Sequence, residues 1–443
     1  QELLRAGFLD DLLNRLPSEP GTSCHIAYSR LHPALIDQPE LAGSAALQRV
    51  RATALASEQG DLAELLKLAA DPAHRQVLEG TVAALHALSA RLRGTPFGEF
   101  DGLLHDAAAI LDLDRQFGPE FRYSPSQLET YLACPFQFFC RYVLNLKPIE
   151  KRDELDEDAT AHGSQMHDVL ESFETKLLNQ PAVGDLAQIA AIEIDRVMQQ
   201  DLAAATDLDL GLLEIERGRT FRSLLQYVSQ RQSYQRDGEP SFSPHALEVD
   251  FGADGSLHPV LEVQQNGRTI QLRGRIDRID VASTPEGLKF RVIDYKSGSV
   301  PSSTEVKHAE MLQLPLYAMA AGRLLFDGTA AGLFDLGYWS LRDEGYRPIA
   351  FENWESDQET LIAFVLDLVD EVRKGIFVVH SRKPGCENYC DYRGVCRLRQ
   401  VRLASKKLDR NLPELSVRSR RGRGGAGGRK PAAGSGPGSE TDS

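Results

Sequence analysis

The chain has 443 residues, 42% of them hydrophobic and 26% charged, which is ordinary for a soluble globular protein of two or three domains. The formal net charge is −14, and because the segment from Ser416 onward holds six basic and two acidic residues, residues 1–415 carry −18. A uniformly basic surface is therefore excluded. Contact with nucleic acid would need a local basic lining, a bound metal or a partner subunit.

Neither a membrane span nor a secretion signal is visible in the sequence. No apolar run has the length that crosses a bilayer and no signal peptide opens the chain, so we expect a cytoplasmic protein without membrane contact. Residue 1 is Gln rather than Met, which suggests a fragment of a longer polypeptide, with a processed start as the alternative.

Residues 1–118 are predicted to form a separate, mostly helical region. Apolar residues recur at helical spacing over residues 2–16 and 62–93, and residues 24–28 are typical of a short strand. The chain contains no G-x-x-x-x-G-K-[ST] loop, so we expect no bound nucleoside triphosphate.

A second series of elements begins after a short linker. Ser124 and Pro125 predict the start of a helix over residues 127–146, which carries Cys134. Residues 147–163 hold six acidic residues and predict an exposed loop, and a helix over 165–178 then carries His167. Residues 181–236 are also predicted to be helical.

Three strands are predicted at residues 245–250, 269–281 and 289–296. Side chains two apart on a strand share a face, so Asp294 and Lys296 project together. The turn over residues 283–287 pairs this strand with the preceding one, which brings Asp277 close to Asp294. Two carboxylates from neighbouring strands favour Mg²⁺ or Mn²⁺, and an adjacent lysine suits phosphodiester hydrolysis.

Further helices and one strand follow the Asp294 strand. A helix over residues 310–325 places Gln313 and Tyr317 four apart on one face. Residues 332–341 predict another strand and residues 358–374 another helix.

The cysteines are grouped rather than spread along the chain. Cys386, Cys390 and Cys396 fall within 11 residues, and Cys134 lies far upstream. Four thiols of this kind permit a tetrahedral site for zinc or an iron-sulfur cluster. Cys140 and Cys24 are interpreted as packing residues. Basic side chains around the group are candidates for phosphate contact, with a solvated face as the alternative: Arg382, Lys383, Arg393, Arg397 and Arg399.

The motif order GSQMH, GRID, IDYKSG, QLPLY resembles the PD-(D/E)XK nucleases of the RecB type. The resemblance implies an α/β, restriction-endonuclease-like core, a central mixed sheet flanked by helices, with helical insertions. It implies a metal site made by His167, Asp277, Asp294 and the backbone carbonyl of Tyr295. It also implies Lys296 as the catalytic lysine, supported by Gln313 and Tyr317.

The segment YSPSQLETYLACPFQFFCRYVLNLKP, residues 123–148, resembles the first-cysteine segment of AddB-type helicase-nuclease subunits. The resemblance implies a [4Fe-4S] cluster held by Cys134, Cys386, Cys390 and Cys396, with Zn²⁺ as the alternative. One departure is the trailing spacing, which is C-x3-C-x5-C here and C-x2-C-x5-C in the family.

These features together predict the domain organisation. Residues 1–118 are a helicase-like remnant or an uncharacterised helical region. Residues 119–405 form the nuclease domain, with a helical insertion at 181–236, and residues 406–443 form a disordered Arg/Gly-rich tail.

The predicted function is metal-dependent hydrolysis of DNA. The resemblance to AddB-type subunits implies an exonuclease that acts on single strands or double-strand ends during break repair and recombination, beside a helicase-nuclease partner subunit. The alternatives are a stand-alone RecB-like nuclease of the CRISPR-adaptation type, a non-catalytic module that binds DNA ends, and a zinc-stapled scaffold.

Overall fold

The computed structural model describes residues 43–56, 60–92, 96–148, 159–179, 185–204, 207–236, 238–329, 331–343, 345–396, 398–403 and 405–418. The chain divides into two compact units, one up to Arg93 and one from Gly94 onward. The predicted elements at residues 2–16 and 24–28, and Cys24 with them, lie outside the described residues. Within the described ranges, no helix has the length and apolar character needed to cross a membrane.

The described part of the first unit contains the helices α3 (Ala45–Ala54), α4 (Ala63–Ala70) and α5 (Pro72–Leu92). The helical spacing predicted over residues 62–93 thus corresponds to two helices, α4 and α5. Asp71 is extended, with ψ at 122°, and its Oδ1 accepts a hydrogen bond from Ala73 N at 2.8 Å. Pro72 has no N–H to continue the first helix, so the chain starts a new one there.

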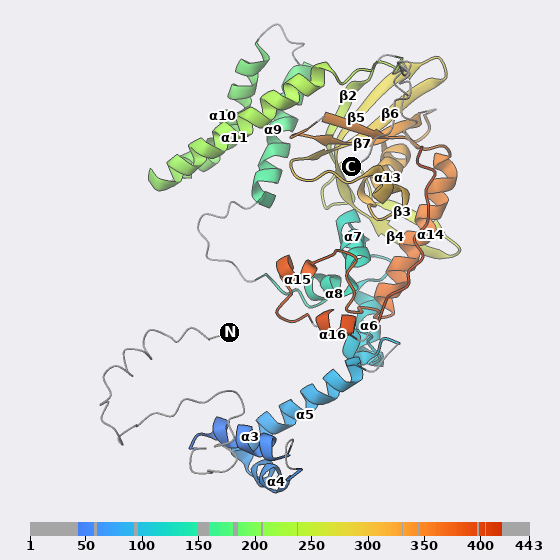
Figure 1. Cartoon of the computed structure of the whole chain (residues 1–443). Coiled ribbons are helices and arrows are strands. Elements are labelled where there is room, and N and C mark those ends of the chain that lie inside the picture. Colours follow the sequence, from blue (N-terminus) through green and yellow to red (C-terminus); the bar gives the residue numbers. More distant parts are fainter. Residues whose placement is uncertain are drawn as a thin grey trace, which may run out of the picture. The chain divides into compact units, whose positions relative to one another are not determined.

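The second unit is built on a five-stranded mixed sheet, in the order β2-β5-β6-β7-β8 (Figure 1). The strands are β2 (Ser243–Phe251), β5 (Gly274–Thr284), β6 (Gly287–Lys296), β7 (Gly332–Ser340) and β8 (Gly345–Ile349). Strand β6 runs parallel to β7, and the other neighbouring pairs are antiparallel. A parallel pair needs a crossover connection, and this one consists of α12 (Ser303–Lys307), α13 (Gln313–Ala320) and a π-helical turn, Ala321–Leu325.

A smaller sheet has the order β1-β4-β3, with β1 at Arg122–Tyr123, β3 at Leu261–Gln265 and β4 at Arg268–Leu272. The single strand predicted over residues 269–281 is thus two strands in two sheets. The reason lies at Arg273, whose N–H donates to Tyr123 O at 2.9 Å and ends the first pairing. At Gly274 an added Cβ would meet the Tyr317 ring at 2.6 Å, so only glycine fits where the second strand begins.

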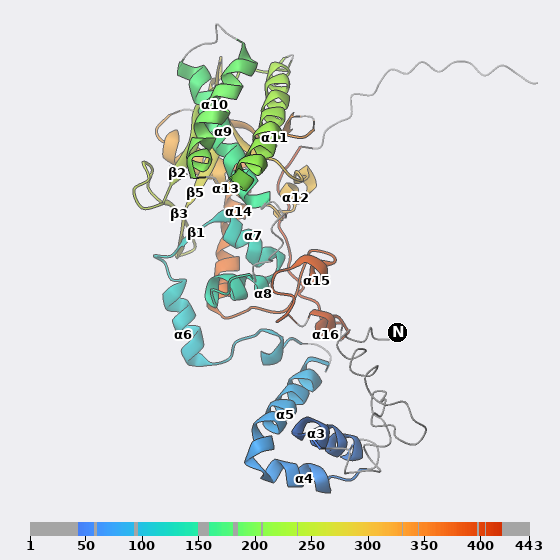
Figure 2. The ribbon, with the colours of Figure 1, turned by 90° about the vertical axis from the view of Figure 1, so that its left-hand side faces the viewer.

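Helices cover both faces of the large sheet (Figures 1 and 2). On one face α9 (Ala159–Asn179), α10 (Leu186–Ala204) and α11 (Asp207–Gln232) share a hydrophobic core with Ile293, Tyr295 and Trp339. On the other face α7 (Pro125–Ala133), α13 and α14 (Trp354–Arg373) pack against Val292 and Leu336. Alternate side chains of β6 therefore enter opposite cores, as the two-residue period of a strand requires.

The remaining helical pieces are short. They are a 3₁₀ turn at Glu99–Asp101, α6 (Ala107–Gln116), α8 (Pro135–Phe138), a π-helical turn at Phe139–Val143, α15 (Cys386–Tyr389) and α16 (Leu398–Leu403). The helix predicted over residues 127–146 is interrupted, because Cys134 is extended at φ −161° and Pro135 starts α8.

Residues 406–418, part of the stretch assigned by composition to a disordered tail, have a fixed place in the fold. Leu415 is buried and its N–H donates to Lys307 O at 2.7 Å, while Ser416 N donates to Asp357 Oδ1 at 2.9 Å. Arg418 N donates to Ala350 O at 2.8 Å. One buried leucine and these backbone bonds outweigh the polar composition, and residues 419–443 lie outside the described part of the chain.

Candidate functional site

His167 is held by helix α9. Met166, Val169, Leu170 and Phe173 recur at helical spacing and are buried against the sheet. His167 follows Met166, so its ring lies at the edge of this apolar stripe, with 29% of its side chain exposed. The ring meets that of Tyr295 edge-on, at 6.0 Å and 89°.

Asp277 lies beside this histidine, on strand β5. Its Oδ2 is 3.5 Å from His167 Nδ1 and accepts a hydrogen bond from the backbone N–H of Tyr295 at 2.8 Å. Only 7% of the Asp277 side chain is exposed. The structure thus brings together His167 and Asp277, two of the four metal ligands that were predicted, and places the backbone N–H of Tyr295 against Asp277.

A further acidic residue, Glu248, lies beside His167 and Asp277 and was missed in the sequence. Glu248 Oε1 lies 3.6 Å from His167 Nδ1, and ligand atoms of His167, Glu248 and Asp277 all lie within 4.8 Å of one another. Strand β2 pairs Leu247 with Arg278 and Val249 with Ile276, which places Glu248 across from Asp277. The signal available in the sequence was the strand itself, a neighbour of the GRID strand that carries a carboxylate.

Crowding of acidic groups shifts the pKa values in this group. Burial raises the pKa of Asp277 well above its ordinary range, and the Asp294 carboxylate raises it further, against the opposing effect of His167. Burial lowers the pKa of His167, but contact with Glu248 and the charge of Asp277 outweigh this and raise it to about 9. The cluster therefore favours positive charge at its centre.

Asp294 and Lys296 lie two residues apart on β6, on one face as predicted. Asp294 is buried, and its Oδ2 is 2.6 Å from Lys296 Nζ. Lys296 Nζ also donates to Gln313 Oε1 at 3.3 Å. Burial lowers the pKa of Lys296, but the charge of Asp294 more than compensates and the pKa is raised, which keeps the ammonium group charged. Asp294 lies on the strand next to Asp277 but is paired with Lys296 rather than grouped with His167 and Glu248.

Tyr317 lies one turn after Gln313 on α13 and is buried against Phe251, with ring centroids 6.1 Å apart at 88°. Burial raises the pKa of its hydroxyl, and the charge of Asp294 adds to this effect. The hydroxyl therefore stays protonated beside the acidic cluster, available as a hydrogen-bond donor.

The donor set fits a hard divalent cation. Carboxylates from Glu248 and Asp277, with one imidazole, match the ligands that Mg²⁺ and Mn²⁺ accept, and Asp294 adds negative charge beside them. Burial and the neighbouring Asp294 carboxylate both raise the pKa of Asp277, and a cation at this position would offset the repulsion between the two carboxylates.

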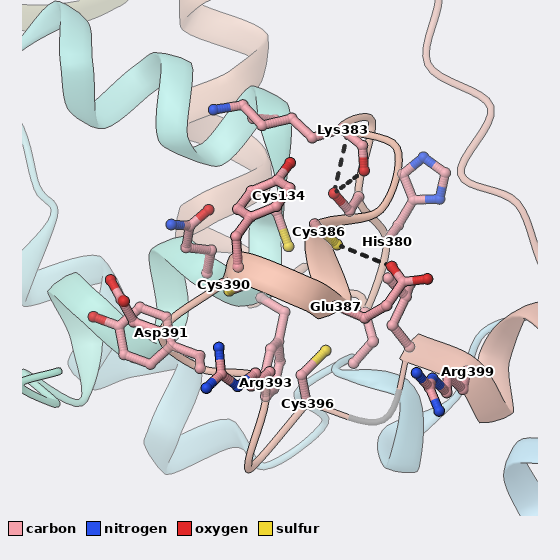
Figure 3. A pocket seen from close by; sticks show the side chains of 18 residues that line it. Cys134, His380, Lys383, Cys386, Glu387, Cys390, Asp391, Arg393, Cys396 and Arg399 are labelled. Atoms are coloured by element: carbon pink, nitrogen blue, oxygen red, sulfur yellow. Dashed lines mark hydrogen bonds between the residues drawn. The ribbon is translucent and has the colours of Figure 1, made fainter. Parts of the chain in front are cut away.

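The four predicted cluster cysteines line one pocket of about 540 Å³ (Figure 3). Cys134 ends helix α7, whereas Cys386, Cys390 and Cys396 come from the C-terminal segment around α15. Cys140 is buried nearby, in agreement with a packing role. Among the basic residues singled out in the sequence, Lys383, Arg393 and Arg399 also line this pocket.

The thiols are close enough to affect one another. Burial raises the pKa of Cys134 to about 12, and the charges of Cys396, Cys386 and Cys390 contribute in the same direction. Four thiols that line one pocket have the donor chemistry of a zinc or iron-sulfur site, although no three of these sulfur atoms all lie within 4.8 Å of one another among the described residues.

Comparison with known proteins points the same way as the geometry. The chain is 34% identical over 209 residues to an ATP-dependent helicase/deoxyribonuclease subunit from Moorella thermoacetica, and this match covers 45% of the chain and 18% of the relative. It is 34% identical over 255 residues to the protein of the same name from Symbiobacterium thermophilum, with 54% of the chain and 20% of the relative covered. The match thus spans about a fifth of these curated relatives.

A family model extends over most of the second unit. The model of the PD-(D/E)XK nuclease superfamily matches residues 122–397, which include the acidic group, Lys296 and the four cysteines described above. Its extent agrees with the mixed sheet and flanking helices of the fold. The chain therefore belongs to the PD-(D/E)XK nuclease superfamily.

Proposed function

We propose that this chain is a metal-dependent DNA nuclease that hydrolyses phosphodiester bonds, working as an exonuclease on DNA ends. The observation that carries the proposal is the group of His167, Glu248 and Asp277 beside the ion pair of Lys296 and Asp294. Membership of a nuclease superfamily gives this geometry its chemical meaning.

His167, Glu248, Asp277, Asp294 and the carbonyl of Tyr295 would hold Mg²⁺ or Mn²⁺. Such an ion, when bound, supplies positive charge that polarises a phosphate oxygen and acidifies a water. Lys296, kept protonated by Asp294, orients the attacking water and stabilises charge that develops on the phosphate. Gln313 fixes the ammonium group from α13, and Tyr317, whose hydroxyl stays protonated, lies one turn further along the same helix.

The setting proposed for this activity rests on the relatives. Both are named as subunits of an ATP-dependent helicase/deoxyribonuclease. By this likeness the chain acts in the cytoplasm on single strands or double-strand ends, in break repair and recombination, with a helicase-nuclease partner subunit. It has no membrane partner in this proposal.

Cys134, Cys386, Cys390 and Cys396 would hold a [4Fe-4S] cluster, with Zn²⁺ as the alternative. The support is the convergence of four thiols on one pocket from segments about 250 residues apart in the chain. The role that fits this placement is structural, since the cluster would join the two ends of the nuclease domain.

The proposal is tested by converting Asp294 to Ala. The variant should lose DNA cleavage in Mg²⁺, because both the metal site and the partner of Lys296 are removed, while the fold remains. Glu286→Ala is the matched control, since Glu286 is an exposed carboxylate in the turn between β5, which carries Asp277, and β6, which carries Asp294. Cleavage by Asp294→Ala at the parental rate would refute the proposed site.

A further inference from the structure

Helix α13, which carries Gln313 and Tyr317, begins without a capping residue of its own. Leu312 occupies the N-cap position, and its apolar side chain offers no acceptor to the N–H groups of the first turn. The first N–H groups of a helix have no intrahelical partner, so a partly buried helix start needs acceptors from elsewhere.

Glu129 supplies this acceptor from 183 residues upstream. Its Oε1 accepts hydrogen bonds from the N–H of Leu312 at 2.7 Å and of Gln313 at 2.8 Å. Burial raises the pKa of Glu129 and these two bonds oppose that effect. A carboxylate at a helix N-terminus is also favoured by the helix dipole.

Helix α7, which carries Glu129, is itself firmly placed. Ser124 caps its start, with Gln127 N donating to Ser124 Oγ at 3.2 Å, and Leu128 and Tyr131 are buried in the core. The Tyr131 hydroxyl donates to Ile376 O at 2.7 Å. Glu129 therefore projects from a rigid helix, and its carboxylate fixes where α13 begins.

Gln313 lies where this cap and the proposed catalytic lysine meet. Its backbone N–H is held by Glu129, and its side-chain Oε1 accepts from Lys296 Nζ at 3.3 Å. The same helix α7 ends at Cys134 in the thiol pocket. A continuous set of contacts thus runs from the cysteines to Lys296.

From these contacts we infer that Glu129 is a positioning residue of the nuclease site. It caps α13, sets the Gln313 side chain against Lys296 and ties the catalytic helix to the cysteine-bearing helix. The part of this inference that concerns catalysis rests on the proposed function, whereas the cap itself does not.

The test compares Glu129→Ala with Glu129→Gln in the full chain. Glutamine keeps the oxygen that accepts both N–H groups and loses the charge, so it should preserve the cap, whereas alanine removes it. Thr130→Ala is the control on the same helix, because the Thr130 hydroxyl donates to Ser126 O within α7.

Amide hydrogen exchange followed by mass spectrometry measures the protection of the Leu312 and Gln313 N–H groups, and it does not require an active enzyme. Glu129→Ala should speed exchange at Leu312 and Gln313, and Glu129→Gln and Thr130→Ala should match the parent. Parental exchange at these two amides in Glu129→Ala would overturn the inference.

Cleavage kinetics in Mg²⁺ test whether Glu129 positions Gln313 against Lys296. Glu129→Ala should lower kcat about a hundred-fold with KM for DNA unchanged, since a misplacement of about 1 Å can have that effect, and Glu129→Gln should recover most of the rate. An unchanged kcat in Glu129→Ala would overturn the positioning role. A parent that cleaves no DNA would contradict the proposed function alone, and the exchange data would still decide whether Glu129 caps α13.

Discussion

At the scale of single residues, Glu248 reaches His167 and Asp277 through an unusual backbone conformation. Its φ is +44°, in the left-handed region that non-glycine residues seldom adopt. Such strain persists where the surrounding structure holds it, and it is concentrated at functional sites. Here the flanking pairs Leu247 with Arg278 and Val249 with Ile276 hold the strand on both sides. We interpret the strained residue as the means by which β2 directs a carboxylate at His167.

Glu248→Gln should therefore weaken metal binding more than it weakens folding. We expect the Mg²⁺ concentration for half-maximal cleavage to rise about 10- to 100-fold, because a neutral amide replaces a charged ligand. Asp254→Asn, in the exposed loop after β2, is the control and should leave the titration unchanged. An identical Mg²⁺ titration for Glu248→Gln and the parent would remove Glu248 from the site.

The residue scale also shows what the sequence could and could not predict. Asp294 and Lys296 were predictable as neighbours because a strand repeats every two residues, and the structure places them 2.6 Å apart. The approach of Glu248 to His167 was not predictable from residue spacing. It depends on a positive φ at Glu248, and a glutamate in the sequence does not indicate a positive φ. Glu129 was hidden for a different reason, because its partners lie 183 and 184 residues away.

At the scale of elements, a buried polar network joins helix α9 to the sheet. Arg278 is almost fully buried and donates to Asp280 at 2.6 and 2.8 Å. Its Nη1 lies 3.4 Å from Glu174 and donates to the Tyr227 hydroxyl at 2.6 Å. Glu174 lies two helical turns after His167 on α9, so the network fixes the helix that presents this histidine.

Arg278→Met should be strongly destabilising. The substitution removes the cation that faces buried Asp280 and leaves this carboxylate with the Tyr234 hydroxyl, which costs about 3–5 kcal/mol in comparable buried pairs, while Glu174 keeps its pair with Arg231. Arg268→Met is the control, because Arg268 pairs with Asp367 and Asp370 at the surface, where a pair contributes about 1 kcal/mol or less. The midpoint temperature of thermal unfolding is measured for both variants and should be lower for Arg278→Met. Equal midpoints would contradict the importance of the network.

Element boundaries were harder to predict than element types. The helix over residues 165–178 and the strand over 289–296 follow from local periodicity, and both are present in the structure. The strand over residues 269–281 changes sheets at Arg273 because Tyr123, 150 residues earlier, takes its N–H. Gly274 marks the boundary in the local sequence, but the distant partner that sends the two strands to different sheets does not show in the local pattern.

At the scale of the whole nuclease domain, the thiol pocket joins distant parts of the chain. Arg382 N donates to Ala133 O at 2.9 Å, directly before Cys134, and the Tyr392 hydroxyl donates to Leu146 O at 3.0 Å. These contacts bring the segment after α14 onto the segment around α7 and α8. A cluster bound by thiols from both segments would strengthen this closure.

Cys134→Ser should break that closure. We expect the anaerobically purified variant to lose the visible absorbance of an iron-sulfur cluster and to unfold at a lower temperature than the parent. Cys140→Ala is the control and should keep the colour, with only the small loss of stability expected when a buried packing side chain loses its sulfur. A Cys134→Ser protein that retains the full absorbance would contradict the ligand assignment, and a colourless parent that holds zinc would contradict the iron-sulfur assignment.

The central claim is that the group around His167 and Lys296 cleaves DNA with a divalent metal. The most direct measurement incubates the anaerobically purified chain with end-labelled single- and double-stranded DNA, in Mg²⁺ or in EDTA, beside Lys296→Ala and the control Lys289→Ala from the same strand. We expect cleavage by the parent and Lys289→Ala in Mg²⁺ only, with short products from DNA ends and none from Lys296→Ala. Cleavage that persists in EDTA, or that Lys296→Ala performs at the parental rate, would contradict the account.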